Sequence, residues 1–202
     1  MEMSIPRSRR ALKAMASNKG RPVCLRKYVF SALLMLPILV VHADTAPADA
    51  WAPVRFMVGR WNGTVTGQAG DGTVTRQYGF VLKDRFIRES NTSTYPPQAK
   101  NKKGEVHEHT SYLSYDKARK QLVIRQFHVE SFVIQYAMTP SATTQNKVVF
   151  DSESFENLNS KWRARETYDI LGPDEFTETF EISEPGKPFE VYSRNHFRRA
   201  AS

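Results

Sequence analysis

The sequence predicts an all-β fold: a single antiparallel up-and-down β-barrel of about ten strands, preceded by a short N-terminal helical turn. The first observation is a series of ten short runs in which apolar and polar residues alternate. The second is that turn sequences such as AGDG, LKDR, LGPDE and SEPGKP separate these runs, so nearly all connections are short and favour antiparallel neighbours. The third is that no convincing amphipathic helix interrupts the series. A meander of this length avoids exposed edges by closing on itself.

The elements follow in order along the chain. A helical turn is expected in WAPVRFMVG, residues 51–59, with Gly59 as its stop. The one long connection, residues 95–104, is polar and interrupted by proline, and is either a solvated loop or a mobile flap at the barrel mouth. The ten predicted strands are Arg60–Gln68, Thr73–Leu82, Arg85–Thr94, Glu105–Tyr115, Lys120–Val129, Phe132–Thr139, Lys147–Phe155, Trp162–Leu171, Glu175–Ser183 and Pro188–Arg199.

The N-terminal region has the layout of a secretory signal peptide. Residues 28–41 are almost wholly apolar, follow Arg26 and Lys27, and precede the sequence VHA, which suits cleavage after Ala43. The apolar run is shorter than the ~20 residues that a membrane-spanning helix needs. We therefore expect a periplasmic or secreted protein. Cleavage after Ala50 and an uncleaved membrane anchor are the alternatives.

This interpretation divides the chain into a signal peptide (1–43), a flexible tether (44–50) and a barrel domain (51–202). Residues 1–43 hold eight of the 29 Lys and Arg but one of the 21 Asp and Glu, so residues 44–202 keep 21 basic and 20 acidic residues. The strong positive charge that would favour a nucleic-acid partner therefore leaves with the signal peptide. The single cysteine, Cys24, leaves with it, and no stable membrane insertion is expected after cleavage.

Gly59 and Trp61 form a Gly-x-Trp motif where the helical turn enters the first strand. This arrangement resembles the calycin group of β-barrels, which includes the lipocalins and the fatty-acid-binding proteins. The resemblance implies that Trp61 closes the base of the barrel and that an arginine from the last strand lies over its ring. The candidate arginines are Arg194, Arg198 and Arg199.

The lead-in FMVGRWNG, the ten runs and the C-terminal YSRNHFRR are closer to the nitrobindin-like barrels and to related uncharacterised secreted bacterial domains. Nitrobindins bind haem through a histidine on the last strands, so the resemblance implies haem as a cofactor and His196 as its ligand. The alternation of residues argues the other way. Phe189, Val191 and Phe197 share one face of the last run, so His196 points outward unless a β-bulge resets the phase.

Three histidines are predicted to share one face of two consecutive strands. HEH places His107 and His109 two residues apart, and HVE places His128 on the following run. If the loop between the runs is residues 116–119, His107 faces His128 directly and His109 faces Gln126. Three imidazoles with a nearby carboxylate have the composition of a metal site. A loop one residue longer would move His128 to the other face, and partly exposed histidines without a metal are the alternative.

Residues 125–138, RQFHVESFVIQYAM, concentrate polar side chains within an alternating pattern. We expect Arg125, His128, Gln135 and Tyr136 to project polar groups into a partly apolar cavity, which is how small-ligand sites are built. The same alternation allows half of them to face solvent.

No enzyme signature is present. The chain has no Gly-x-Ser-x-Gly elbow, and GQAGDG lies in a hairpin without a following helix. The carboxylates of DSESFE, RARETYD and EFTETFE look like a solvated sheet face, so no catalytic residue is predicted. The expected function is binding of a small apolar or amphipathic ligand, with haem as one candidate, inside the barrel. The alternatives are a metal protein or metalloenzyme that uses His107, His109 and His128, and a barrel filled by side chains that serves as a structural or interaction module.

Overall fold

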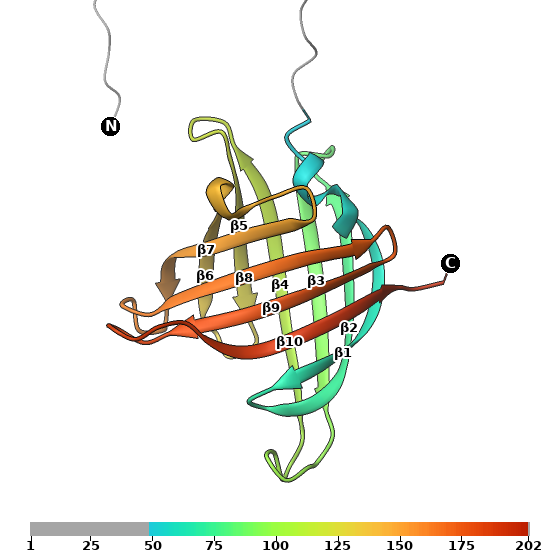
Figure 1. Ribbon diagram of the computed structural model, residues 1–202, viewed down its shortest axis with the longest axis vertical. Helices are drawn as coiled ribbons and strands as arrows, with labels where there is room; N and C mark the ends of the chain where they lie inside the picture. Colours follow the sequence, from blue (N-terminus) through green and yellow to red (C-terminus); the bar gives the residue numbers. More distant parts are fainter. Residues whose placement is uncertain (1–48, 202) are drawn as a thin grey trace, which may run out of the picture. The chain divides into compact units, whose positions relative to one another are not determined.

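Ten alternating strands close into a barrel in the computed structural model, which describes residues 49–201 (Figure 1). Each strand pairs antiparallel with its neighbours in sequence, and the last pairs with the first. The predicted fold class and the ten predicted runs are confirmed, with small shifts at the strand ends. The strands are β1 (Gly59–Gly67), β2 (Gly70–Val81), β3 (Phe86–Tyr95), β4 (Glu105–Asp116), β5 (Gln121–His128), β6 (Val133–Met138), β7 (Lys147–Glu156), β8 (Arg163–Gly172), β9 (Glu175–Ser183) and β10 (Glu190–Arg199).

The predicted helical turn is a 3₁₀ helix, η1 (Ala52–Met57), and a shorter one, η2 (Pro140–Ala142), precedes β7. The Asp49 carboxylate accepts hydrogen bonds from the Trp51 backbone N–H at 3.0 Å and from the Arg55 guanidinium at 2.6 and 2.9 Å, which fixes the start of η1. Within residues 49–201, no helix is long and apolar enough to cross a membrane. The predicted signal peptide and most of the tether lie outside the described residues.

One end of the barrel carries η1 and is called here the closed end (Figure 1). Trp61 lies at this end, next to Met57, the last residue of η1. Its side chain is 1% exposed, its Nε1–H donates to the Met57 carbonyl at 2.7 Å, and its ring meets the edge of Phe176 at 4.7 Å. The Arg199 guanidinium lies 4.2 Å from the centre of the Trp61 ring and donates to the Val58 carbonyl at 2.9 Å. An arginine of the last strand thus lies over the Trp61 ring, which is the arrangement that the calycin resemblance implies.

Of the three candidate arginines, Arg199 is the one over Trp61. Arg194 is exposed and pairs with Thr66 and Thr179, far along β10 from the closed end, which corrects the expectation for this residue. Gly59 is required where it stands, because its φ is +134° and a Cβ atom there would lie 2.5 Å from Arg199 Nη1. The glycine of the Gly-x-Trp motif thus leaves room for the Arg199 guanidinium that lies over Trp61.

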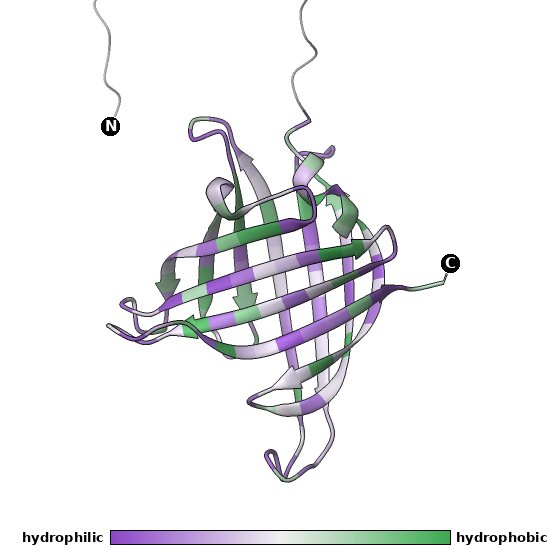
Figure 2. Cartoon of the chain, viewed as in Figure 1, coloured by the Kyte–Doolittle hydropathy of each residue, from purple (hydrophilic) through white to green (hydrophobic). Residues whose placement is uncertain are grey.

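The inward-facing side chains change character along the barrel axis. Apolar side chains around Trp61 and η1 form the core cluster, and Figure 2 shows hydrophobic and hydrophilic residues interspersed along the strands. Polar and charged residues are also buried inside the barrel, and seven of them come from seven different strands. We call this group the polar belt; it consists of Arg76, Glu89, Ser111, Gln126, Glu166, Glu178 and Asn195.

Candidate functional site

A cavity of about 320 Å³ opens at the end of the barrel opposite η1, called here the open end. The connections β1–β2, β3–β4, β5–β6, β7–β8 and β9–β10 surround this end, and the β3–β4 connection extends furthest from it in Figure 1. Members of the polar belt line the inner part of the cavity, and aromatic side chains line its mouth. These aromatic residues are Tyr95, Phe132, Trp162, Phe180 and Tyr192.

The β4–β5 hairpin brings three histidines to the mouth of this cavity. The Asp116 carboxylate accepts the backbone N–H groups of Ala118 and Arg119 at 3.0 and 3.1 Å, so the turn lies one residue later than the sequence predicted. His109 therefore faces His128, and the predicted direct pairing of His107 with His128 is corrected. A turn displaced by one residue moves the pairing by two, so all three histidines stay on the inner face.

In this three-histidine cluster (His107, His109 and His128), the ring centres lie 5.3–5.9 Å apart. One nitrogen of each ring is paired with an oxygen. The pairs are His107 Nδ1 with Glu130 Oε1 at 2.8 Å, His128 Nε2 with Gln126 Oε1 at 2.9 Å, and His109 Nε2 with Glu89 Oε1 at 3.1 Å. The remaining nitrogens of His107 and His128 lie 3.4 Å apart, and the remaining nitrogen of His109, Nδ1, is buried without a partner.

His128 is held flat against Phe132, with the ring centres 4.0 Å apart. Burial, together with the neighbouring His109 and His107, lowers the pKa of His128 to about 2. His128 is therefore a neutral imidazole at physiological pH, with a lone pair on one nitrogen.

The polar belt below the cluster is organised by one buried cation. Arg76 forms ion pairs with Glu89 at 3.0 Å and Glu178 at 2.6 Å, donates to Asn91 at 2.9 Å, and lies 4.6 Å over the ring of Phe197. Burial would raise the pKa of Glu89, but the Arg76 guanidinium and, after it, the contact with His109 outweigh burial and lower the pKa to about 2. Arg76 therefore keeps Glu89 ionised inside the barrel.

Glu166 behaves differently from Glu89. Burial raises the pKa of Glu166 to about 8, and the carboxylates of Glu178 and Glu89 act in the same direction. Gln126 Nε2 donates to one oxygen of Glu166 at 3.0 Å, and the other oxygen lies 2.6 Å from the Tyr168 hydroxyl. Glu166 is therefore mostly protonated at neutral pH and can itself donate a hydrogen bond.

Sequence reasoning missed Glu166 and Glu178, which lie in RARETYD and EFTETFE, two segments whose composition is typical of a solvated sheet face. A signal was present. Residues two positions away on a strand share its face, and Glu178 is flanked in this way by Phe176 and Phe180. Glutamate between two apolar residues of the same face indicates an inward carboxylate.

Two of the four residues predicted in the 125–138 stretch reach the interior. His128 lines the cavity, and Tyr136 is fully buried with its hydroxyl 3.4 Å from Gln126 Oε1. Arg125 and Gln135 pair with each other across β5 and β6, and their side chains bond Ser114 and Glu153 on the outer face. Their predicted place in the cavity is therefore corrected. Arg125 is three residues from His128, and strand alternation puts it on the opposite side.

His196 lies outside the barrel. Its side chain is 43% exposed, and its Nε2 lies 2.6 Å from Glu175 Oε1 on the neighbouring strand. The only irregularity in the pairing of β10 with β9 falls between Val191 and Ser193, ahead of His196, and so does not turn this residue inward. His196 therefore does not fit the role of a ligand to a haem in the interior.

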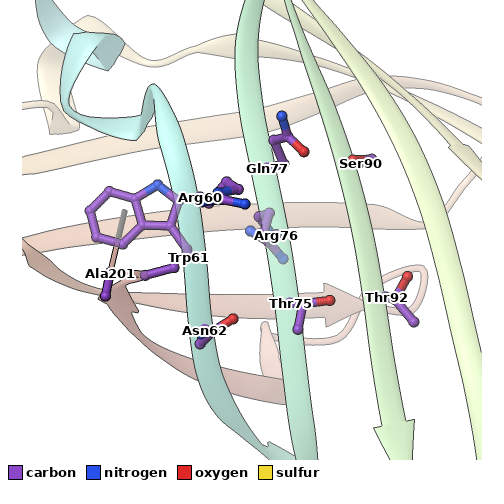
Figure 3. Close-up of a pocket in the computed structure, with 10 residues that line it drawn as sticks. Arg60, Trp61, Asn62, Thr75, Arg76, Gln77, Ser90, Thr92 and Ala201 are labelled. Carbon is purple, nitrogen blue, oxygen red and sulfur yellow. The ribbon is translucent and has the colours of Figure 1, made fainter.

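A second hollow, of about 420 Å³, lies on the outer face of β1–β3 (Figure 3). Its solvent-facing side chains are hydroxyls and amides with a single cation, and Figure 3 shows them spread along three strands rather than converging. They are Arg60, Asn62, Thr75, Gln77, Ser90 and Thr92. This surface is ordinary for the solvated face of a sheet, so the interior cavity is the candidate site.

No protein-family model and no curated protein matches this sequence. Among solved structures, the crystal structure of Rv2717c from M. tuberculosis matches with a TM-score of 0.56 at 18% sequence identity, covering 78% of this chain and 100% of that one. This likeness shows that the barrel has a calycin-like, nitrobindin-like fold.

Two engineered proteins also match, each at 10% identity and a TM-score of 0.38, which is too low to support an argument. The match to the redesigned β-barrel covers 93% of that protein and 72% of this chain. The match to the de novo designed fluorescence-activating β-barrel covers 99% of that protein and 75% of this chain.

Proposed function

We propose that this protein binds a small amphipathic molecule in the cavity at the open end of the barrel. The observation that carries the proposal is the lining of that cavity, in which aromatic and aliphatic walls meet a convergent set of polar groups. Small-molecule sites have this composition, in cavities of about 300–1,000 Å³. A cavity of about 320 Å³ suits a compact ligand. Haem held through His196 is not part of the proposal, because that residue lies outside the barrel.

Unpartnered polar atoms support the proposal. Asn195 Oδ1 and His109 Nδ1 are buried and have no hydrogen-bond partner, and both residues line the cavity. Buried polar groups are normally satisfied, and an exception calls for an explanation such as a bound molecule. A ligand with a polar head would meet these atoms, while its apolar part would lie against residues such as Phe132 and Phe180.

Filling the cavity tests the proposal. Val65 is 2% exposed on the inner face of β1, and its neighbour Thr66 faces outward. Val65→Phe should weaken binding of the amphipathic dye anilinonaphthalene sulfonate about tenfold or more, because the larger ring occupies the ligand's space. Thr66→Phe, which adds the same ring outside the barrel, should leave binding unchanged. The measurement is dye fluorescence, with quenching of Trp162 at the cavity mouth as a second readout.

Saturable binding that responds to Val65→Phe alone supports interior binding. Absence of saturable binding to the wild-type protein, or equal binding by both variants, would contradict it. Thermal unfolding of both variants shows that each is folded before the comparison is made.

We also propose export to the periplasm or the medium, on the basis of the apolar segment at residues 28–41. Cleavage after Ala43 leaves Asp49 in place to hold η1 through Trp51 and Arg55, whereas cleavage after Ala50 removes it. The retained contact therefore favours the earlier cut. Mass spectrometry of the exported protein should find Asp44 as its first residue, and an intact chain retained in the cell would contradict export.

A further inference from the structure

We propose that the three-histidine cluster (His107, His109 and His128) is a binding site for one divalent transition-metal ion, for which Zn²⁺ is the probe. The site lies at the mouth of the interior cavity, on one hairpin. It does not depend on the dye-binding proposal, because the metal ligands are side chains of β4 and β5 alone.

The first argument is the direction in which the rings are held. Each imidazole uses one nitrogen for an oxygen acceptor, and those acceptors belong to Glu130, Gln126 and Glu89. Metal-bound histidines are held in this way, with the second ring nitrogen donating to a carboxylate or another oxygen. When each of these nitrogens donates its N–H to the oxygen, His107 Nε2, His128 Nδ1 and His109 Nδ1 carry the lone pairs available to a cation.

The second argument is distance. A tetrahedral Zn²⁺ with Zn–N bonds of 2.0–2.1 Å places its ligand nitrogens roughly 3.4 Å apart. His107 Nε2 and His128 Nδ1 lie 3.4 Å apart, and one nitrogen from each of the three rings can be chosen so that all lie within 4.8 Å of one another. For a tetrahedral ion to form, the third nitrogen has to approach the other two by rotation of its side chain.

The third argument rests on an unsatisfied hydrogen-bonding atom and not on the distances between the rings. The His109 side chain is 8% exposed, and its Nδ1 is buried without any partner. A hydrogen-bonded network among the three rings would account for the 3.4 Å contact between His107 and His128, but it would leave this atom unsatisfied. A metal ion satisfies it.

The charges around the cluster also favour a cation. Inside the barrel, Arg76 is opposed by the carboxylates of Glu89 and Glu178. At the mouth, Glu105 and Glu130 stand close enough to His107 to form a second group of possible ligands that shares this histidine. A positive ion entering from solvent therefore meets carboxylates first and imidazoles next.

Three histidine ligands leave an open coordination position, as in zinc sites that bind an exchangeable water or a small ligand. All three histidines line the cavity, so that position is accessible from it. The chemical class that the site would take is an oxygen-donor head group, such as a carboxylate.

The test is titration calorimetry of the purified protein, expressed from the full chain and stripped with a chelator, against Zn²⁺ and separately against Co²⁺. We expect one ion per chain, and an absorption spectrum of tetrahedral Co²⁺. His109→Ala should weaken Zn²⁺ binding at least a hundredfold, and His107→Gln, at a partly exposed position, should do the same with less risk to folding. His196→Ala is the matched control, because it removes a histidine from the outer face, and it should leave binding unchanged.

A positioning role for Glu130 gives a further readout. Glu130→Gln should weaken Zn²⁺ binding about ten- to a hundredfold and shift the Co²⁺ spectrum, because it changes the acceptor of His107 without removing a ligand. Absence of saturable Zn²⁺ binding, an octahedral Co²⁺ spectrum, unchanged binding in folded His107→Gln, or loss of binding in His196→Ala would each overturn the proposal. Val65→Phe should retain Zn²⁺ binding, so failure of this proposal and failure of dye binding are distinguishable.

Discussion

The two ends of the barrel use the same strand alternation for opposite purposes. At the closed end, inward residues such as Trp61, Phe176 and Phe197 pack ring against ring. At the open end, inward residues such as His109 and Asn195 keep polar atoms without partners. Alternation decides which side chains face inward, but the size and polarity of those side chains decide where the barrel is filled. We therefore expect the closed end to contribute most to stability and the open end to bind the ligand.

The largest effect should come from breaking the closed end. Trp61→Ala should lower the free energy of unfolding by about 3–5 kcal/mol, because it removes a fully buried ring and leaves a cavity. Trp162→Ala, which changes the same residue type at the cavity mouth, should cost much less, because Trp162 is only partly buried. Chemical denaturation of both variants measures the difference. Equal losses would show that the open end contributes to stability as much as the closed end.

A smaller effect is expected at Glu166, in the polar belt. Its pKa in the folded protein is about 8, above the ordinary value of 4.5, so the folded state keeps a proton that the unfolded chain releases. The wild-type protein should therefore lose stability as the pH rises from about 4.5 to 8. Glu166→Gln imitates the protonated form and should remove this loss, so the variant should be more stable than the wild type at the upper end of that range.

Denaturation at several pH values checks this prediction. The two proteins should have similar stability in acid and diverge as the pH rises, because Gln does not titrate. Parallel curves across the whole range would mean that Glu166 is ionised in the folded barrel. A gain in stability at the expense of binding is the relation expected where a site is built from buried polar groups.

The smallest of these effects concerns the arginine over Trp61. Arg199→Lys keeps the charge but loses the planar group that lies on the ring and reaches the Val58 carbonyl. The free energy of unfolding should fall by about 1–2 kcal/mol. Arg194→Lys on the exposed side of β10 is the matched control and should change it by less than about 0.5 kcal/mol. A similar fall in the free energy of unfolding for both variants would show that Arg199 has no special role in stability.

The sequence predicts the fold well because alternation and turns are local signals. Each of the ten runs shows its own pattern, and closure follows from their number and from short connections. The three-histidine cluster could also be predicted, because the register of the β4–β5 hairpin alone decides whether these histidines share a face. An error of one residue in the turn moved the pairing by two, which kept His107, His109 and His128 on the inner face.

The polar belt could not be predicted in the same way. Arg76 and Glu178 form an ion pair across 102 residues of sequence, and nothing in either strand alone reveals the partner. A buried charge is stable only where another strand supplies its counter-charge. The parity of β9 can therefore indicate that Glu178 faces inward, but it cannot show which charge stabilises the carboxylate there.

The separation in sequence between contacts at the two ends has a consequence for the order of folding. His107 and His128 are 21 residues apart on one hairpin, whereas the contact of Arg199 with Val58 closes a loop of 141 residues. Loop closure is slower for contacts that are distant along the chain. The hairpin with the histidines can form early, and the barrel is sealed at Trp61 only when the two ends of the domain meet. A metal ion present while the chain folds would meet a finished binding hairpin before it meets a finished barrel.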